Sequence, residues 1–174
     1  MTPEQTFADF LAKEPLVRFS GYSQIQAQTL REAAEEICSL LDSSIRDEKF
    51  VDGSNLNVIY GRFWMWVLGA YEVTRTMSEY KTCFSSSLTS RVADFKAQIS
   101  VLRMPLAKLQ FKGSDKPING EASIYSVDMK DKDFVFQVGD KRFPMRGLIN
   151  GFNSLIASIK PEDVLFDLRE APKL

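Results

Sequence analysis

One segment constrains the fold more than any other, the run RFWMWVLGAYEVTRTMSE at residues 62–79. It contains both tryptophans of the chain, and apolar side chains surround the helix axis on every side as far as Tyr71. A helix that is apolar all round is normally buried on all faces. The segment therefore predicts the central helix of a compact bundle, over residues 56–81. Two charged residues, Glu72 and Arg75, follow where the helix should still lie near the core.

Further helices are expected beside this central one. Residues 23–46 repeat apolar side chains at steps of three and four, which makes one stripe on an otherwise acidic helix. The next helix, which we call the seam helix, carries a heptad-like repeat. Its apolar positions are Leu88, Val92, Phe95, Ile99, Leu102, Leu106 and Leu109. Pro105 lies inside the repeat and predicts a kink at residues 101–104 or an early end. A shorter helix, capped by Thr2 and ended by Pro15, should come first.

The periodicity changes from helical to alternating after residue 120. Three short strands are expected, at residues 122–128, 133–138 and 141–145. Gly139 and Asp140 give a tight hairpin turn between the last two strands. A final helix should cover residues 146–159, and the tail at 162–174 holds enough apolar side chains to dock on the rest of the chain.

These elements define an α+β fold class with one domain. We expect an antiparallel helical bundle of about four long helices, with a small three-stranded antiparallel β meander before the last helix. The domain covers residues 1–174, divided into a helical bundle at 1–111, the meander at 121–145 and a C-terminal helix and tail at 146–174. A chain of 174 residues is an ordinary length for one such domain.

The chain contains no histidine, which excludes several kinds of chemistry. Ser-His-Asp and Cys-His catalysis, histidine acid–base catalysis and the usual zinc sites all need that side chain. The sequence also has no glycine-rich phosphate loop and no nucleophile-elbow motif. An enzyme of this composition would depend on carboxylates, Lys, Tyr or Cys. We therefore assign no catalytic residue, no metal site and no cofactor.

Composition also indicates a compartment. Cys38 and Cys83 each lie in an apolar helical pattern without CxxC spacing, which is typical of buried free thiols in a reducing compartment. The sequence has no apolar run long enough to cross a membrane and no basic cluster at its N-terminus. These features predict a cytoplasmic protein that does not associate with membranes.

The net charge of −1 is unevenly distributed. Residues 1–55 carry 5 basic and 10 acidic side chains, whereas residues 56–116 carry 9 and 4. Six basic side chains follow one another through the seam helix and the loop after it: Arg91, Lys96, Arg103, Lys108, Lys112 and Lys116. One interpretation is contact with nucleic-acid phosphates. The favoured one is a solvated helix face, paired with the acidic helix, because the net charge is near zero.

A second set of charged residues occupies the central helix. Glu72, Arg75 and Glu79 share one helix face, and Arg62 lies ten residues before Glu72. One interpretation is a ligand pocket in which Arg75 binds an anion, Glu72 acts as a base or ligand contact, and Tyr71 lines the wall. The favoured interpretation is a partly buried ion pair that sets helix register.

The pattern Trp66-Val-Leu-Gly-Ala-Tyr71-Glu72-x-x-Arg75-Thr76 resembles the central helix of HEPN-type helical bundles from prokaryotic defence and toxin systems. The resemblance covers about a dozen residues. It implies a helical bundle, and in active members an RNase with an Arg followed by a His some five or six residues later. Because this chain has no His, the resemblance implies an inactive, binding or scaffolding relative. The expected β meander departs from the plain bundle.

Taken together, these features predict a non-enzymatic interaction or regulatory module of a prokaryotic protein. Its partner would be a protein, with a second copy of the chain as one candidate, bound through the seam helix or the edge of the meander. The first alternative is a nucleic-acid-binding protein that uses residues 91–116. The second alternative is a small-ligand-binding protein or enzyme with a Glu72/Arg75 pocket.

Overall fold

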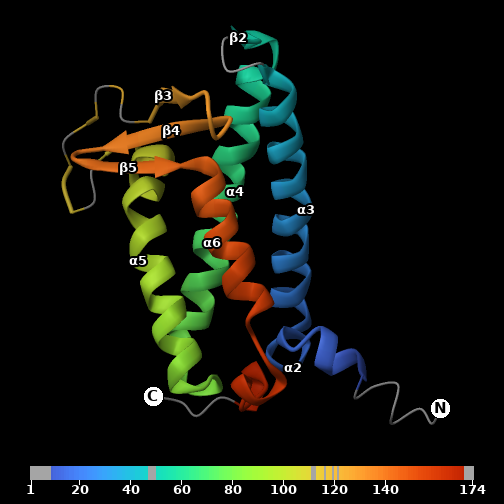
Figure 1. Ribbon diagram of the computed structural model, residues 1–174. Helices are drawn as coiled ribbons and strands as arrows, with labels where there is room; N and C mark the ends of the chain where they lie inside the picture. The colour runs from blue at the N-terminus through green and yellow to red at the C-terminus, as the bar shows by residue number, and fades with distance from the viewer. Residues whose placement is uncertain are drawn as a thin grey trace.

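The computed structural model describes residues 9–46, 50–110, 113–115, 117–118, 120 and 122–170, with the backbone alone for Phe50. Long helices form most of the molecule, and a small antiparallel sheet precedes the last helix (Figure 1). The long helices are α3 (Gly21–Ser44), α4 (Leu56–Glu79), α5 (Ser86–Lys108) and α6 (Met145–Ala157). The predicted α+β fold class is confirmed. No helix within the described residues has the length and apolar character that crossing a membrane requires.

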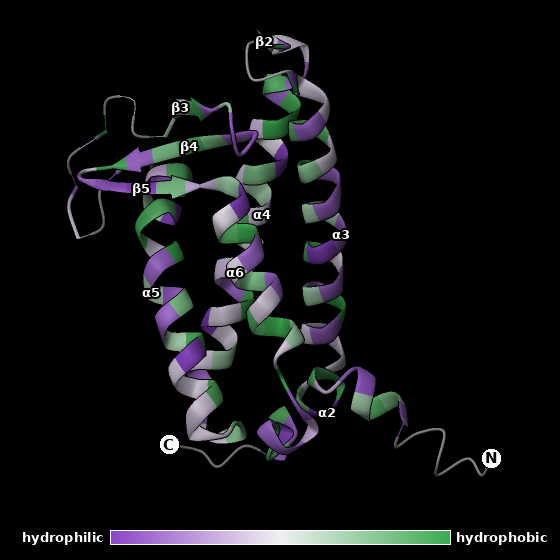
Figure 2. Cartoon of the chain, viewed as in Figure 1, coloured by the Kyte–Doolittle hydropathy of each residue, from purple (hydrophilic) through white to green (hydrophobic). Residues whose placement is uncertain are grey.

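Helices α3, α4 and α5 form a layer in which neighbours run in opposite directions and α4 lies in the middle (Figure 1). Helix α4 packs along both neighbours, whereas α6 lies over one broad side of the layer and packs on α3 and α5. Hydrophilic and apolar residues alternate along α3 and α5 (Figure 2), as expected for helices with one buried side. The ends of α3 and α4 lie within two residues of the predicted ends.

Side-chain caps explain where two of these helices begin. Ser20 accepts a hydrogen bond from the backbone N–H of Ser23 at the start of α3, and Ser85 accepts one from Leu88 at the start of α5. Helix α5 does not stop at Pro105 but continues to Lys108. Leu109 then has a φ of 54°, the left-handed conformation that commonly ends a helix.

The sheet consists of β3 (Ile124–Asp128), β4 (Asp133–Val138) and β5 (Lys141–Pro144). The strands pair in the order β3-β4-β5 and are all antiparallel, so the predicted meander is confirmed. Gly139, with a φ of 58°, lies in the tight turn between β4 and β5, where a side chain would be strained. The Phe136 ring stacks on Phe63 of α4 with 5.4 Å between centroids, which attaches the sheet to the helical layer.

Several short elements were not predicted. They are α2 (Leu16–Phe19), the hairpin of β1 (Ile45–Arg46) and β2 (Phe50–Val51), and four 3₁₀ turns at Gly53–Asn55, Lys81–Cys83, Pro161–Asp163 and Leu168–Glu170. Each is too short to show a period in the sequence. Residues 9–13 are helical, and Pro15 directly precedes α2 instead of only ending the first helix. The predicted cap at Thr2 lies outside the described residues.

The C-terminal segment docks as predicted, at the junction of α4 and α5. The backbone N–H of Leu165 donates to the carbonyl of Cys83 at 2.8 Å, and that of Ser85 donates to the carbonyl of Asp163 at 2.9 Å. Val164 between them is fully buried. These contacts tie the segment after α6 back to the start of α5.

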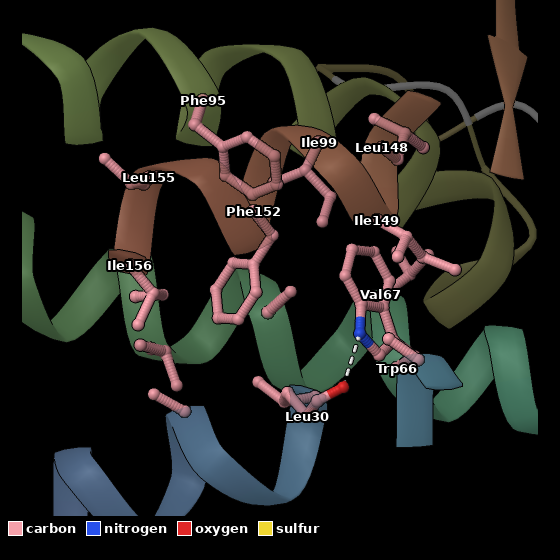
Figure 3. Close-up of a cluster of buried hydrophobic side chains, with 14 of the residues drawn as sticks. Leu30, Trp66, Val67, Phe95, Ile99, Leu148, Ile149, Phe152, Leu155 and Ile156 are labelled. Atoms are coloured by element: carbon pink, nitrogen blue, oxygen red, sulfur yellow. Dashed lines mark hydrogen bonds between the residues drawn. The ribbon is translucent and has the colours of Figure 1, made fainter. Parts of the chain in front are cut away.

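Trp66 lies where three helices meet (Figure 3). Its side chain is 1% exposed, its Nε1 donates to the carbonyl of Leu30 on α3 at 3.1 Å, and Phe152 of α6 meets its ring edge-on with 5.7 Å between centroids. A Cβ added at Gly69 would lie 2.8 Å from a methyl carbon of Leu30. The glycine therefore lets α3 approach α4 closely at this level.

Helix α4 is not buried on all sides, so the prediction from its all-round apolar sequence was wrong in this respect. Met65 is 64% exposed, Val58 45% and Trp64 38%. The reason is the layered architecture: α3 and α5 flank α4, and α6 and the sheet cover only one of the two remaining sides. The other side of α4 therefore keeps apolar side chains in contact with solvent.

The two tryptophans should differ sharply in their contribution to stability. We expect Trp66→Ala to lower the free energy of unfolding by about 3–5 kcal/mol, because it empties a site at the junction of three helices. Trp64→Ala should cost clearly less, because Trp64 is partly in solvent. Urea unfolding followed by circular dichroism measures both. Equal losses would contradict the assignment of Trp66 as the centre of the core.

Candidate interaction surface

Arg75 binds two glutamates of its own helix. Its Nε donates to Oε2 of Glu72 at 2.7 Å, and its Nη1 donates to Glu79. The side chains of Arg75, Glu72 and Glu79 are 40%, 47% and 51% exposed. The hydrogen bond with Glu72, followed by that with Glu79, raises the pKa of the Arg75 guanidinium. These residues thus form an ion-pair cluster in contact with solvent.

The other two residues of the predicted ligand site point elsewhere. Arg62 turns toward α3 and pairs with Glu36. Tyr71 turns toward α5, where the guanidinium of Arg103 lies 4.9 Å from its ring centroid. The structure therefore does not bring Arg62, Tyr71 and the Arg75 cluster together around one cavity.

The predicted basic run is divided between two sides of α5. Arg91 turns toward α6 and the C-terminal segment, where it donates to Ser158 and pairs with Asp163 at 3.5 Å. Lys96 and Arg103 line the groove between α5 and α4. Lys108 is exposed in the last turn of α5. The remaining two, Lys112 and Lys116, lie outside the described residues.

The groove between α4 and α5 forms a pocket of about 320 Å³. Its walls are Tyr71 of α4 and Ala93, Lys96, Ala97, Ser100, Arg103 and Met104 of α5. The cation–π contact with Tyr71 positions Arg103 beside this pocket. Lys96 and Arg103 make no ion pair with any carboxylate in the part of the chain that the structure describes. The pocket therefore combines an aromatic wall with two cations, which suits a carboxylate or phosphate group.

Next to this groove runs the exposed apolar stripe of α4. The exposed Val58 and Met65 and the half-buried Leu68 are spaced by seven and three residues and share one helix face. Trp64 joins them at the α5 side, where its Nε1 donates to the carbonyl of Leu106 at 2.9 Å. The core residues Phe63 and Val67 lie two residues to either side of Met65, about 200° away around the helix. The stripe therefore faces away from the core and from α6.

We call the side of the layer opposite α6 the outer face. It carries the apolar stripe of α4 in its middle, continued along α4 by the Glu72, Arg75 and Glu79 cluster one helical repeat later. The groove lies on the α5 side and acidic residues lie on the α3 side. Its principal side chains are Glu32, Glu36, Val58, Trp64, Met65, Leu68, Tyr71, Lys96, Arg103 and Met104. Periodicity had indicated the charged residues of this face but not its exposure, because a buried and an exposed apolar helix side have the same sequence pattern.

One buried carboxyl group, at the start of α6, was not singled out in the sequence. Asp133 is 3% exposed, and its oxygens accept hydrogen bonds from the backbone N–H of Arg146 at 3.0 and 3.3 Å. Burial raises the pKa of this carboxyl to about 6. Arg146 in turn binds the carbonyls of Lys132 and Cys38 and pairs with Asp42 at 2.7 Å. Both Asp133 oxygens thus cap α6. The hydrogen-bonded set of Asp133, Arg146 and Asp42 joins the sheet to α3.

The thiols lack the lowered pKa of reactive cysteines. Burial raises the pKa of both Cys38 and Cys83, with Asp167 adding to the effect at Cys83. A thiolate is the nucleophilic form, so a raised pKa lowers reactivity at neutral pH. The structure contains no cluster of three or more potential metal ligands within the described residues.

No protein-family model matches this chain, and neither the curated proteins nor the solved structures include a significant match.

We expect Glu72→Gln to leave the fold nearly unaffected. An ion pair in contact with solvent contributes little, and Arg75 keeps Glu79 as a partner. The Tm should therefore shift by about 2 °C or less. Differential scanning calorimetry checks this expectation. A large loss of stability would show that the cluster sets helix register, as the sequence had suggested.

Stability should depend on the protonation of Asp133. Because its folded pKa of about 6 lies above its ordinary value, the stabilisation is complete below about pH 4 and is lost as pH rises through 6. Asp133→Asn keeps an acceptor oxygen and cannot ionise. The free energy of unfolding of the original chain, relative to that of this variant, should therefore be higher at pH 4 than at pH 7. Urea titrations at both pH values test this, with exposed Asp131→Asn as control, and parallel profiles for all three proteins would contradict it.

Proposed function

We propose that this chain is a non-enzymatic interaction module that binds another protein through its outer face. The observation that carries the proposal is the uncovered apolar stripe of α4, with Met65 64% and Trp64 38% exposed. Trp, Tyr, Met and Arg are the residues enriched at the centres of protein interfaces, and the outer face carries all four. Covering the stripe would remove apolar surface from water, which favours association.

The charges around the stripe indicate which kind of partner surface would bind. The cations Lys96 and Arg103 have no carboxylate partner among the described residues, so the α5 side suits acidic residues of the partner. The stripe itself suits an apolar helix surface that runs along α4. The partner in this proposal is therefore a folded helical protein with apolar and acidic residues on one face.

Other features support a binding role over catalysis. Arg75 holds Glu72 and Glu79, Asp133 caps a helix, and burial raises the pKa of both thiols. The HEPN-like segment at residues 66–76, without a histidine, fits a binding relative. The proposal places the module in the cytoplasm, which accords with two free cysteines.

Nucleic-acid binding is the second candidate, favoured by Lys96 and Arg103 on one side of α5 and by the exposed Lys108 in its last turn. Phosphates would bind these cations, and a base would stack on Tyr71. The acidic residues Glu32 and Glu36 at the opposite edge of the outer face oppose it by repelling phosphate. The following experiment separates the two candidates.

A photo-crosslinking amino acid placed at residue 65 tests the proposal in cells of the source organism. We expect a covalent adduct with a protein, identified by mass spectrometry, when the probe replaces Met65. The control places the same probe at Tyr125 on the sheet, which is 56% exposed and lies away from the outer face. That variant should give no corresponding adduct.

Two results would overturn the proposal. One is the absence of a protein adduct at residue 65, or equal adducts at residues 65 and 125. The other is an adduct that nuclease digestion removes, which would support nucleic-acid binding instead. Retention on heparin that Arg103→Ala/Lys108→Ala abolishes would support that second candidate independently.

A further inference from the structure

The net charge of the three helices of the layer changes in order from α3 to α5. Helix α3 has four acidic side chains and one basic, α5 has four basic and one acidic, and the charges of α4 cancel. Net charge therefore runs from −3 on α3, through zero on α4, to +3 on α5. Asp42 and Arg91 form their ion pairs on the α6 side, so on the outer face this order is represented by Glu32 and Glu36 at the α3 edge and by Lys96 and Arg103 at the α5 edge. A surface with this order of charge is complementary to a copy of itself turned through 180° about the line of α4.

Contacts between the helices fix the level of these charges along the layer. Arg62 pairs with Glu36, so Glu36 lies beside the N-terminal half of α4. Trp64, two residues later on α4, reaches the carbonyl of Leu106 on α5. Glu36 and Leu106 therefore lie at nearly the same level, on opposite sides of Met65.

We call Glu32 and Glu36 the acidic patch and Arg103 and Lys108 the basic patch. Each lies within about one helical turn of the contact that fixes its level. Helix α4 separates the two patches, so they do not pair within one chain. Arg103 and Lys108 form no ion pair, and Glu32 bonds only to Gln28, in the described part of the chain.

We propose that the partner of the outer face is a second copy of this chain, packed on a two-fold axis parallel to α4. This inference rests on the proposed function and names its partner. The axis sets Met65 against Met65 of the other copy, and it brings the Arg75 cluster, which lies on the same side of α4, near the same cluster of the other copy. It also sets each acidic patch against the basic patch of the other copy, twice in the dimer. Such a self-complementary contact is the usual form of a two-fold interface.

Charge selects this axis over the alternative. A two-fold axis perpendicular to α4 within the interface would lay α3 on α3 and α5 on α5, which sets like charges against each other. Like-charge contacts disfavour an arrangement by several kcal/mol. Only the parallel axis places opposite charges together at both edges of the apolar stripe.

The outer face is large enough for a stable dimer. Three helices of this length, packed at about 9 Å, give a face of roughly 36 by 18 Å, or about 650 Å² in projection. Accessible area exceeds projected area, so each copy can bury close to the ~800 Å² of a standard interface.

Sedimentation equilibrium of the full chain tests the oligomeric state. We expect a dimer at about 100 µM in low salt, with an apparent Kd that rises about tenfold or more between ~0.05 M and ~0.5 M NaCl, because salt screens the facing patches. Met65→Glu should give a monomer with an unchanged circular dichroism spectrum, whereas Tyr125→Glu should stay dimeric.

A reciprocal charge exchange tests the geometry. The variants Glu32→Lys/Glu36→Lys and Arg103→Glu/Lys108→Glu should each be monomeric, because like charges then face each other at both edges. Mixing the two should restore a dimer of one copy of each, since both edges regain opposite charges. Lys130→Glu/Lys141→Glu, a matched reversal at an exposed turn residue and an exposed strand residue of the meander, should leave the dimer intact.

Cysteine pairs check the direction of the axis. With the axis parallel to α4, residues 58 and 65 each face themselves in the other copy. Val58→Cys and Met65→Cys should therefore both form chain-to-chain disulfides on mild oxidation, whereas a perpendicular axis permits at most one.

Several outcomes would overturn the inference. They are a single-chain mass at ~100 µM, a dimer that survives Met65→Glu, and charge variants that do not recombine. A crosslink from residue 65 to a different protein, with the chain itself monomeric, would overturn the second copy as partner and leave the proposed function standing. An absence of crosslinks from residue 65 would overturn both.

Discussion

The structure depends on the close packing around Leu30, where α3 and α4 meet. Gly69 leaves room for the side chain of Leu30, and the indole of Trp66 donates to its carbonyl at 3.1 Å. Phe152 of α6 packs edge-on against the same indole, so one side chain connects three helices. Once α4 is fixed in this way, its rotation is fixed too. Phe63 and Val67 must then face the core, and Met65 must face solvent.

This rotation gives the helical layer two different sides. The inner side is covered by α6 and by the sheet. The stacked rings of Phe136 on β4 and Phe63 on α4 attach the sheet to the helical layer. The outer side keeps Met65 and the groove at Arg103 in contact with water. Because the acidic and basic helices flank α4, the outer side also carries opposite charges at its two edges. The architecture therefore produces a surface with an apolar centre and two charged margins.

Much of the fold could be predicted from the sequence, because long helices and alternating strands leave a periodic signal. The ends of α3 and α4 and the β4 strand were located closely from that signal, whereas the early end that Pro105 suggested for α5 does not occur. The environment of α4 could not be predicted, since Met65 and Trp66 are both apolar and the sequence does not record which one a neighbour covers. Contacts between distant residues, such as Tyr71 with Arg103, also leave no local pattern. Short elements such as α2 lack the length to show a period.

The position of α6 has a consequence for how the chain folds as it is synthesised. Helices α3, α4 and α5 are sequence neighbours in an up-and-down order, so they pair through local contacts that form early. The contact between Trp66 and Phe152 spans more than eighty residues and must wait until the sheet and α6 have been made. Until then the layer exposes apolar side chains on both of its broad sides. The nascent chain thus passes through a state more prone to association than the finished fold, and α6 ends that state.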